Sequence, residues 1–303
     1  LAMVSSSTLK ELLNEYDKKQ MIAISELEKR KSELYARIPR LQEIETELNS
    51  FAIKTAKALL VKFDPSYISE LQSKANDLRL ERETILKKDG KDISYLSPHY
   101  ECSKCKDTGY VLDDGKSVMC SCLKQQILNI EYNNSNIGNL DRENFKKFNL
   151  NLYSDEVNEE KYGSDLSPRE NIKVIGKEVK KFIKNFDDPN EKNLLFSGGT
   201  GLGKTFLSNC IVAELLAKGK TVLYQTAPVM LDTLISELFD KNSNNAFSQN
   251  LLTVDLLVID DLGTETMNSM KFTELYKIIN TRLLNQNGKI TKITNTNTDT
   301  KEY

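Results

Sequence analysis

The sequence predicts an α/β fold built on a parallel sheet, preceded by an α-helical region and a small cysteine-rich segment. Residues 8 to about 95 contain no glycine before Gly90 and are dominated by Leu, Glu, Lys, Arg, Gln and Ala, which favour helix. Four of the five cysteines then fall within residues 102–122. From about Pro168 onward, short apolar runs alternate with helical stretches, a pattern typical of a parallel sheet covered by helices.

Length and composition exclude several classes of protein. The 303 residues are 39% hydrophobic and 28% charged, which suits packed cores in two domains, or in one domain with a long appendage. Lys and Arg number 42 against 44 Asp and Glu, so the net charge of -2 excludes a polycation that coats nucleic acid by charge alone, but not a local basic face. No apolar run approaches the ~20 residues of a membrane span, and residues 1–10 lack a secretory signal, so we expect a cytoplasmic protein without membrane contact.

The helical region, residues 1–95, carries a short coiled-coil-like seam. Its leucines recur every seven residues, at Leu27, Leu34, Leu41 and Leu48. Pro39 should break the helix, and a second break near Asp64-Pro65 should precede a helix over residues 66–88. Two interpretations stay open: a bundle that packs on itself, or a module that docks on a partner protein or self-associates.

The cysteine segment, residues 96–125, has the spacing of a zinc site. Two close pairs, Cys102 with Cys105 and Cys120 with Cys122, are separated by 14 residues, so a hairpin-sized loop can bring four thiolates around one tetrahedral ion. Four filled positions leave none open, which indicates a structural Zn²⁺. The alternatives are free or disulfide-linked cysteines, or a site in which His99, the single histidine, replaces one cysteine. Cys210 is expected to be a small core residue.

Residues 126–167 are rich in Asn, Asp, Ser and Tyr and are interpreted as a linker with short helical pieces. Residues 168–303 are expected to form the α/β domain, with a first helix over residues 171–185. Four short apolar runs are its predicted strands: residues 193–197, 221–225, 256–259 and 290–294.

The most specific motif follows the first of these strands. It fits G-x-x-x-x-G-K-[ST] and consists of Gly198, Gly199, Thr200, Gly201, Leu202, Gly203, Lys204 and Thr205. Glycines let the backbone turn so that its N–H groups face phosphate oxygens, and the following helix presents its positive end to the same anion. Lys204 can reach the β- and γ-phosphates of ATP, and the Thr205 hydroxyl can bind Mg²⁺.

Two carboxylates end the third predicted strand, at the edge where α/β sheets bind ligands. We assign Asp260 to the Mg²⁺ shell, through water, and Asp261 to orienting or deprotonating the attacking water. The alternative is that the pair only caps a turn. A polar residue after the fourth strand could contact the γ-phosphate or hold the water; Asn297 is the first candidate and Asn295 the second, with an ordinary turn residue as the alternative.

Together these features resemble the bacterial replicative helicase loaders of the DnaI/DnaC type, which are AAA+ ATPases. The resemblance rests on the helical N-terminal part, the C-x-x-C-x-x-T-G-Y segment ending in C-x-C-L, the G-G-T-G-L-G-K-T loop and L-L-V-I-D-D-L-G-T-E. It implies an α/β P-loop NTPase with an AAA+ core. It also implies that Lys204 and Thr205 are Walker A residues, that Asp260 and Asp261 are the Walker B pair, and that Asn297 is the sensor.

The same resemblance implies partners and a task. The helical and cysteine parts would bind the hexameric replicative DNA helicase, and the ATPase domain would bind ATP and single-stranded DNA while the helicase ring is placed on DNA. ATP-dependent self-association is a further expectation. Two other functions stay open. One is a transposition-helper AAA+ ATPase, although that group usually lacks the zinc segment. The other is a nucleotide-bound adaptor that does not turn over ATP.

Two features depart from the family pattern. Asp261 stands where many AAA+ proteins have Glu, although this loader group often has Asp. The sequence ends at Tyr303, so we expect an ATPase domain that is C-terminally incomplete, without the helical lid, arginine finger and second sensor arginine. The motifs still predict ATP hydrolysis, but without these C-terminal elements we do not expect full turnover by this chain alone. Arg282 is a candidate intersubunit arginine, with an ordinary surface residue as the alternative.

Overall fold

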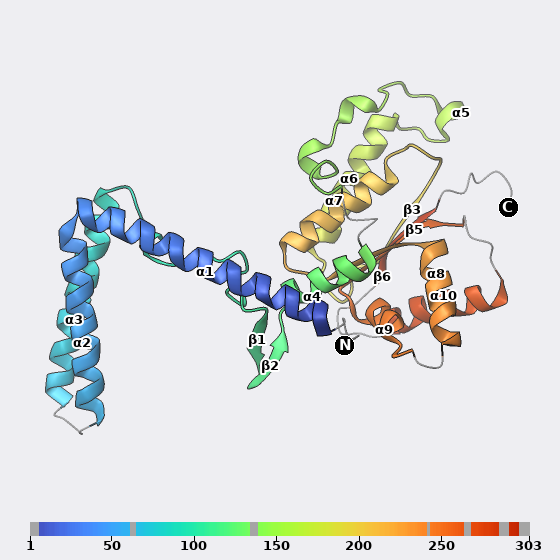
Figure 1. Ribbon diagram of the computed structural model, residues 1–303. Coiled ribbons are helices and arrows are strands. Elements are labelled where there is room, and N and C mark those ends of the chain that lie inside the picture. Colours follow the sequence, from blue (N-terminus) through green and yellow to red (C-terminus); the bar gives the residue numbers. More distant parts are fainter. Residues whose placement is uncertain are drawn as a thin grey trace. The chain divides into compact units, whose positions relative to one another are not determined.

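The structure is a computed structural model that describes residues 6–60, 65–133, 139–240, 243–263, 268–284 and 291–296 (Figure 1). The chain divides into two compact units: Glu11–Val111, which we call the helical unit, and Leu112–Tyr303 together with Leu1–Lys10, which we call the sheet unit. Among the described helices, none combines the length and apolar character that crossing a membrane requires. The finer division of residues 1–167 into three regions stays a prediction.

The described residues of the helical unit form three long helices and one short 3₁₀ helix. They are α1 (Ser6–Arg37), α2 (Pro39–Leu60), α3 (Pro65–Lys88) and η1 (Ile93–Leu96). The predicted break at Pro39 is confirmed, because proline lacks the N–H that would continue α1 but is well suited to begin α2. Helices α2 and α3 lie side by side (Figure 1). Leu34 and Leu41 of the predicted seam pack with Leu86 in one buried cluster, as the self-packing interpretation predicts.

The larger sheet is parallel and has four described strands in the order β3-β6-β5-β4. They are β3 (Leu194–Ser197), β6 (Thr291–Thr296), β5 (Leu256–Leu262) and β4 (Val222–Thr226). Each of the four apolar runs singled out in the sequence is therefore a strand. The predicted fold class, a P-loop α/β core with a helical region and a cysteine segment before it, is confirmed.

Helices cover both faces of this sheet, which explains why β4 and β5 are apolar on both sides. On one face lie α6 (Pro168–Lys184) and α7 (Lys204–Ala217), and on the other lie α8 (Ala227–Phe239), α9 (Ala246–Thr253) and α10 (Ser269–Leu284) (Figure 1). Neighbouring residues of β4 divide between the two cores: Val222 and Tyr224 join the first, whereas Leu223 joins the second.

Short elements precede α6. They are the hairpin β1 (Tyr110–Asp113) and β2 (Lys116–Met119), then α4 (Ser121–Leu128), the π-helix η2 (Asn129–Asn133), the 3₁₀ helices η3 (Phe145–Lys147) and η4 (Leu150–Leu152), and α5 (Glu159–Tyr162). Composition predicts a linker over residues 126–167, but its described parts pack on the core. Leu128 joins the cluster beneath α8 and α9, and Phe145 packs against the cluster beneath α6 and α7.

Candidate functional site

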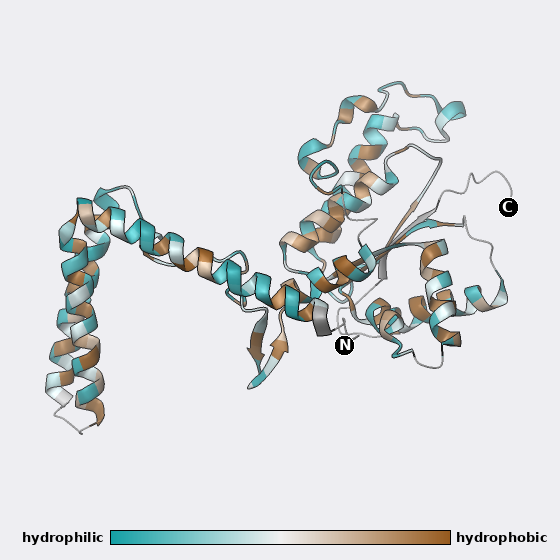
Figure 2. Ribbon diagram, viewed as in Figure 1, coloured by the Kyte–Doolittle hydropathy of each residue, from teal (hydrophilic) through white to brown (hydrophobic). Residues whose placement is uncertain are grey.

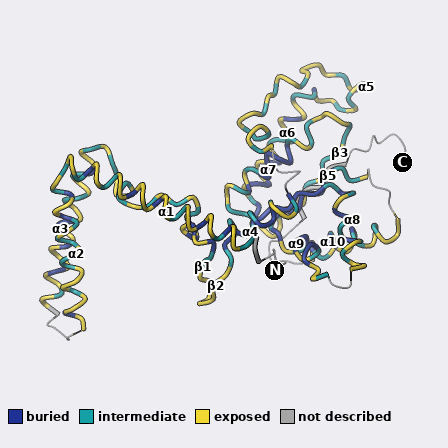
Figure 3. The backbone as a smooth tube through the Cα atoms, viewed as in Figure 1, coloured by how far each residue is buried: buried dark blue, intermediate teal, exposed yellow. Residues whose placement is uncertain are grey.

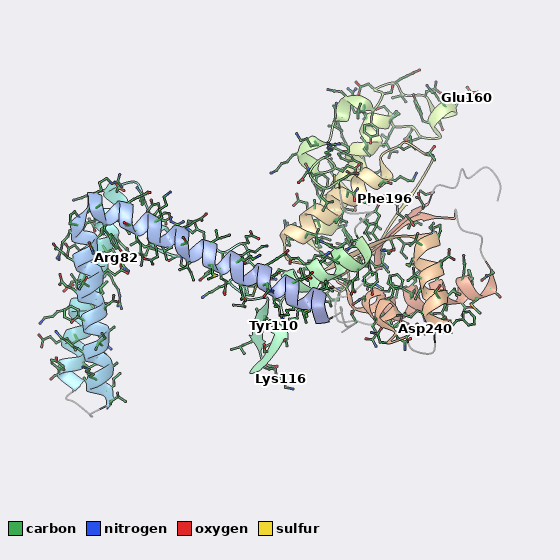
Figure 4. The ribbon with its side chains drawn as sticks, viewed as in Figure 1. Arg82, Tyr110, Lys116, Glu160, Phe196 and Asp240 are labelled. Atoms are coloured by element: carbon green, nitrogen blue, oxygen red, sulfur yellow. The ribbon has the colours of Figure 1, made fainter. Side chains whose placement is uncertain are left out.

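The phosphate loop, residues 198–205, connects β3 to α7. Phe196 in β3, labelled in Figure 4, packs against the core beneath α6 and α7 and so anchors the strand that leads into the loop. Gly198, Gly201 and Gly203 have φ angles of +146°, +76° and +92°, which residues with a side chain rarely adopt. A Cβ on Gly203 would also come 2.8 Å from the Tyr153 hydroxyl oxygen. The loop conformation therefore depends on its glycines.

Lys204 and Thr205 begin α7. Lys204 Nζ donates hydrogen bonds to the carbonyl oxygens of Gly198 (2.9 Å) and Gly199 (2.8 Å), so the ammonium group lies across the loop. The first N–H groups of a helix have no intrahelical acceptor and carry partial positive charge. The chemistry of the ammonium group and of these amides suits an anionic phosphate chain.

Asp260, near the end of β5, lies beside the start of α7. Its side chain is buried, at 4% exposure, and its Oδ2 accepts a hydrogen bond from Thr205 Oγ1 at 3.2 Å. A hydroxyl oxygen and a carboxylate oxygen are ligands that Mg²⁺ prefers, directly or through water. The pair therefore fits the magnesium ion predicted from the sequence, and such an ion would neutralise charge on the phosphates.

Asp261 occupies a bulge in β5. Ile259 and Leu262 are three residues apart, whereas their partners on β6 are two apart, so β5 has one extra residue here. Asp261 has a φ of +55°, a left-handed conformation that Asp tolerates better than most residues. Its backbone N–H donates to Asp260 Oδ1 at 2.9 Å. The bulge thus fixes the Asp260 carboxylate and sets Asp261 outside the regular alternation of the strand.

Sequence reasoning missed Tyr224, on the neighbouring strand β4. Its side chain is 2% exposed, and its hydroxyl donates to Asp260 Oδ2 at 2.5 Å. Burial, reinforced by the hydrogen bond to Asp260, raises the pKa of the Tyr224 phenol far above its ordinary range, so the group remains a donor. Alternation along β4 places Tyr224 on the Val222 face, but the register with β5, which brings Tyr224 and Asp260 together, is not encoded in either strand alone.

Tyr153, in the segment interpreted as a linker, is a second residue that sequence reasoning missed. Its hydroxyl donates to the Leu202 carbonyl oxygen at 3.2 Å. Its ring stacks on Phe148, with ring centroids 6.0 Å apart, and Phe148 in turn contacts Phe206 of α7. These aromatic rings fix the segment before α6 against the phosphate loop.

Two of the predicted site residues cannot be placed by their side chains. Asn297 lies outside the described residues, and the side chain of Asn295 in β6 is likewise outside them.

The surface and intersubunit interpretations of Arg282 are both wrong for this structure, because its side chain is fully buried. Its guanidinium donates to the carbonyl oxygens of Leu251 (2.7 Å) and Val254 (3.0 Å), which end α9. Burial lowers the pKa of Arg282 to about 10. Its place inside the fold and its bonds to the end of α9 give it a structural role.

Side-chain amides cover the edge of β4. Gln125 accepts from the Val222 N–H at 2.6 Å and donates to the Val222 carbonyl at 3.0 Å. Asn133 donates to the same carbonyl at 2.9 Å and accepts from the Tyr224 N–H at 2.9 Å. These two amides make the hydrogen bonds that a further strand would make, and they fix α4 and η2 on the strand that carries Tyr224.

The four predicted zinc ligands lie together. The ligand atoms of Cys102, Cys105, Cys120 and Cys122 are all within 4.8 Å of one another. Four sulfurs placed 2.3 Å from one tetrahedral zinc ion would be about 3.8 Å apart, so the arrangement fits Zn²⁺. His99 is exposed and is not a member of this cluster.

Cys210, in contrast, is fully buried in α7, as predicted, and burial raises the pKa of its thiol to about 12.

A buried carboxylate shapes the turn that carries the first cysteine pair. Asp107 is 2% exposed and accepts hydrogen bonds from the N–H groups of Glu101 (2.9 Å) and Cys102 (2.8 Å). The N–H of Lys106 donates to the Cys102 carbonyl at 2.8 Å, and Lys106 and Asp107 both have left-handed φ angles. The tight turn around Cys105 is therefore stabilised by hydrogen bonds of the chain itself.

Comparison with known proteins assigns the nucleotide site to a family. Residues 177–298, which contain the phosphate loop, Asp260 and Asp261, match the family described as IstB-like ATP binding protein. These residues form an IstB-like ATP-binding domain. The proteins that it resembles include replication proteins, with DnaC among them.

The identities to curated relatives are moderate and local. The replicative helicase loader DnaC of Escherichia coli (strain K12) is 33% identical over 107 residues, which cover 34% of this chain and 42% of DnaC. The uncharacterized protein YdaV of the same strain is 33% identical over 90 residues, covering 30% and 36%. The chromosomal replication initiator protein DnaA of Caulobacter vibrioides (strain NA1000 / CB15N) is 32% identical over 114 residues, covering 37% and 23%. The match thus spans less than half the length of each relative.

Two solved structures resemble the chain over part of its length. A crystal structure of the DnaC helicase loader has 26% identity and a TM-score of 0.37, over 48% of this chain and 80% of that one. A crystal structure of DnaI has 22% identity and a TM-score of 0.39, over 53% and 74%. Scores of this size do not define the fold, which follows from the strand order and the phosphate loop.

Proposed function

We propose that this protein is an ATP-dependent loader that recruits a replicative DNA helicase and places it on DNA during the initiation of replication. The observation that carries the proposal is the sequence relation between its ATP-binding domain and the replicative helicase loader DnaC. The phosphate loop and the Thr205–Asp260 pair supply a site whose chemistry fits ATP and Mg²⁺. The cysteine cluster supports the choice of loader, because transposition helpers usually lack such a segment.

The residues of the site divide the chemistry among them. The amides of residues 198–205 and the Lys204 ammonium group would bind the β- and γ-phosphates. Thr205 and Asp260 would hold a magnesium ion, which would supply positive charge beside the phosphates. Asp261 orients the attacking water and accepts its proton. ATP hydrolysis by this chain and the sensor role of Asn297 are parts of the same proposal.

The partners follow from the loader function. Residues 1–125 are proposed to bind the hexameric helicase, and the ATP-binding domain to bind single-stranded DNA and to self-associate when ATP is bound. Met21 and Ile22 of α1, which are 71% and 58% exposed, offer apolar side chains to such a protein partner. Dispersed exposed apolar residues are common, so these two support the proposal without carrying it.

The nucleotide site is tested by Lys204→Ala. Because the ammonium group makes charge-assisted contacts with phosphate, its loss should weaken ATP binding in the presence of Mg²⁺ by roughly 100-fold, or about 2.7 kcal/mol. Isothermal titration calorimetry measures the affinity, and the melting temperature should not change. Lys192→Ala, an exposed lysine just before β3, is the control and should bind ATP normally. Unaltered affinity in Lys204→Ala would contradict the assignment.

The partner is tested by affinity capture of the tagged full chain from its native cell. Recovery of the replicative helicase, dependent on ATP, is the expected result. Recovery of a transposase instead would favour a transposition helper, the second candidate. Helicase capture without any ATP turnover, with or without single-stranded DNA, would favour the nucleotide-bound adaptor.

A further inference from the structure

Tyr224 is a core residue whose side chain reaches the nucleotide site. Its ring packs in the buried cluster between the sheet and helices α6 and α7. Its hydroxyl oxygen is 2.5 Å from Asp260 Oδ2. A purely apolar core position would be filled equally well by phenylalanine, so the hydroxyl group itself requires an explanation.

The strand register explains how the two side chains meet. In the parallel pair β4–β5, Tyr224 is opposite Val258, so Asp260 lies two residues further along the neighbouring strand and on the same face. Diagonal neighbours of this kind are within reach only of long side chains. A tyrosine at position 224 is thus long enough to place a donor on a carboxylate at the end of β5.

The carboxylate of Asp260 is held from three directions. Its Oδ1 accepts from the Asp261 N–H at 2.9 Å, and its Oδ2 accepts from both Thr205 Oγ1 at 3.2 Å and the Tyr224 hydroxyl. The hydroxyl of a threonine can bind a cation through a lone pair while it still donates its proton, so the Thr205 bond is compatible with a bound ion. The Tyr224 bond acts on the same oxygen from the core side and does not use a group that binds nucleotide.

We propose that Tyr224 is a positioning residue for magnesium: its hydroxyl holds Asp260 Oδ2 beside Thr205, so that the carboxylate is in place when Mg²⁺ binds with the nucleotide. This inference rests on the proposed nucleotide-binding function. It concerns the cation requirement, because the Tyr224 hydroxyl donates to Asp260, the carboxylate proposed to hold the magnesium ion.

The experiment uses the full chain and Tyr224→Phe, which keeps the ring and removes the hydroxyl. Affinity for a non-hydrolysable ATP analogue is measured by calorimetry in EDTA and over a Mg²⁺ titration. We expect the affinity in EDTA to be unchanged and the half-saturating Mg²⁺ concentration to rise roughly tenfold, as for the loss of one hydrogen bond to a charged group. Tyr132→Phe, whose ring packs on the opposite face against Phe247, is the matched control and should leave the Mg²⁺ requirement unchanged.

A double-mutant cycle separates positioning from packing. In an Asp260→Asn background, Tyr224→Phe should cause no additional rise in the Mg²⁺ requirement if it acts through Asp260. An unchanged Mg²⁺ requirement in Tyr224→Phe, or an equal loss of affinity with and without Mg²⁺, would overturn the inference while the nucleotide site stands. Failure of the wild-type chain to bind the analogue under any condition would overturn the proposed function and this inference together.

Discussion

The helical unit and the sheet unit bury their apolar residues in different ways. In the helical unit a narrow set of leucines is buried, while residues close by remain exposed, such as Leu59 at 63% and Leu80 at 64%. Its helices alternate hydrophobic and hydrophilic residues along their length (Figure 2). In the sheet unit, buried residues gather on the strands and on the helices that cover both faces (Figure 3).

The difference shows which unit can fix chemical groups precisely. Strands β4 and β5 are held on both faces, so Tyr224 and Asp260, whose side chains leave the same face, are fixed by the core beneath them. The helical unit has no such two-sided core among its described residues, and its charged side chains pair at the surface. Arg40 donates to both carboxylate oxygens of Glu81, at 2.8 and 3.0 Å, and also contacts Glu43 and Glu47. A single exposed ion pair contributes at most about 1 kcal/mol, and a bidentate network such as this one is the favourable case.

The largest expected effect is at the cysteine cluster, where a metal ion would join the four side chains. Cys105→Ser should lower the zinc content of the purified protein from about one ion per chain to none, because a structural site needs all four ligands. Residues 102–122 should then lose protection in hydrogen exchange, while ATP affinity stays unchanged. Metal analysis of Cys210→Ala, a cysteine outside the cluster, provides the control. Zinc retained in Cys105→Ser would refute the site.

A second test removes the centre of the helical unit's core. Leu86 is fully buried against Leu34 and Leu41, so Leu86→Ala should destabilise this unit by about 2–5 kcal/mol. Urea unfolding followed by circular dichroism measures the change. Leu80→Ala, at a position 64% exposed in the same helix α3, should have a far smaller effect. Nucleotide affinity should remain normal in both variants, and its loss in Leu86→Ala would show that the two units do not act separately.

The smallest effect concerns the start of α6 in the sheet unit. Ser167 caps this helix and forms a reciprocal capping box with Glu170. Ser167→Ala should cost about 1 kcal/mol in thermal or urea unfolding, since one N-terminal N–H loses its acceptor. A loss equal to that of Leu86→Ala would contradict the expectation that a helix cap contributes less stability than a buried leucine.

The same capping box predicts a pH dependence with a definite sign. Hydrogen bonds from the backbone N–H and hydroxyl of Ser167 lower the pKa of Glu170 below its ordinary value. A carboxyl group whose pKa is lower in the folded state stabilises the fold at neutral pH, and this contribution is lost as the pH falls through that lowered pKa. In Glu170→Gln, which retains the box without a charge, this part of the pH dependence of unfolding should disappear.

Local patterns in the sequence predict the elements and the loop well. The four strands, the break at Pro39, the glycine-dependent phosphate loop and the convergence of the four cysteines all follow from spacing between nearby residues. Contacts between side chains on neighbouring strands do not follow from local spacing, because the packed sheet sets the register. The hydrogen bond between Tyr224 and Asp260 is one instance. The burial of Arg282 is another, since an arginine near the end of a helix is usually exposed and only the carbonyls that end α9 give it a buried role.

The segment before α6 misleads for a related reason. Asparagine-rich composition is typical of linkers, yet the Asn133 amide pairs with the backbone of β4. The Gln125 amide, at the end of the predicted cysteine segment, does the same. Composition does not distinguish an amide that faces water from one that meets a strand.

Those two amides also bear on where the chain can be cut. A fragment that began at α6 would leave the outer edge of β4 with unpaired N–H and C=O groups, and an uncovered strand edge is a template on which identical chains can stack. An expression boundary chosen by composition, at residue 168, would therefore favour aggregates. A boundary placed before α4 would keep the edge of β4 covered. A fragment of the ATP-binding domain intended for expression on its own should therefore begin well before the phosphate loop.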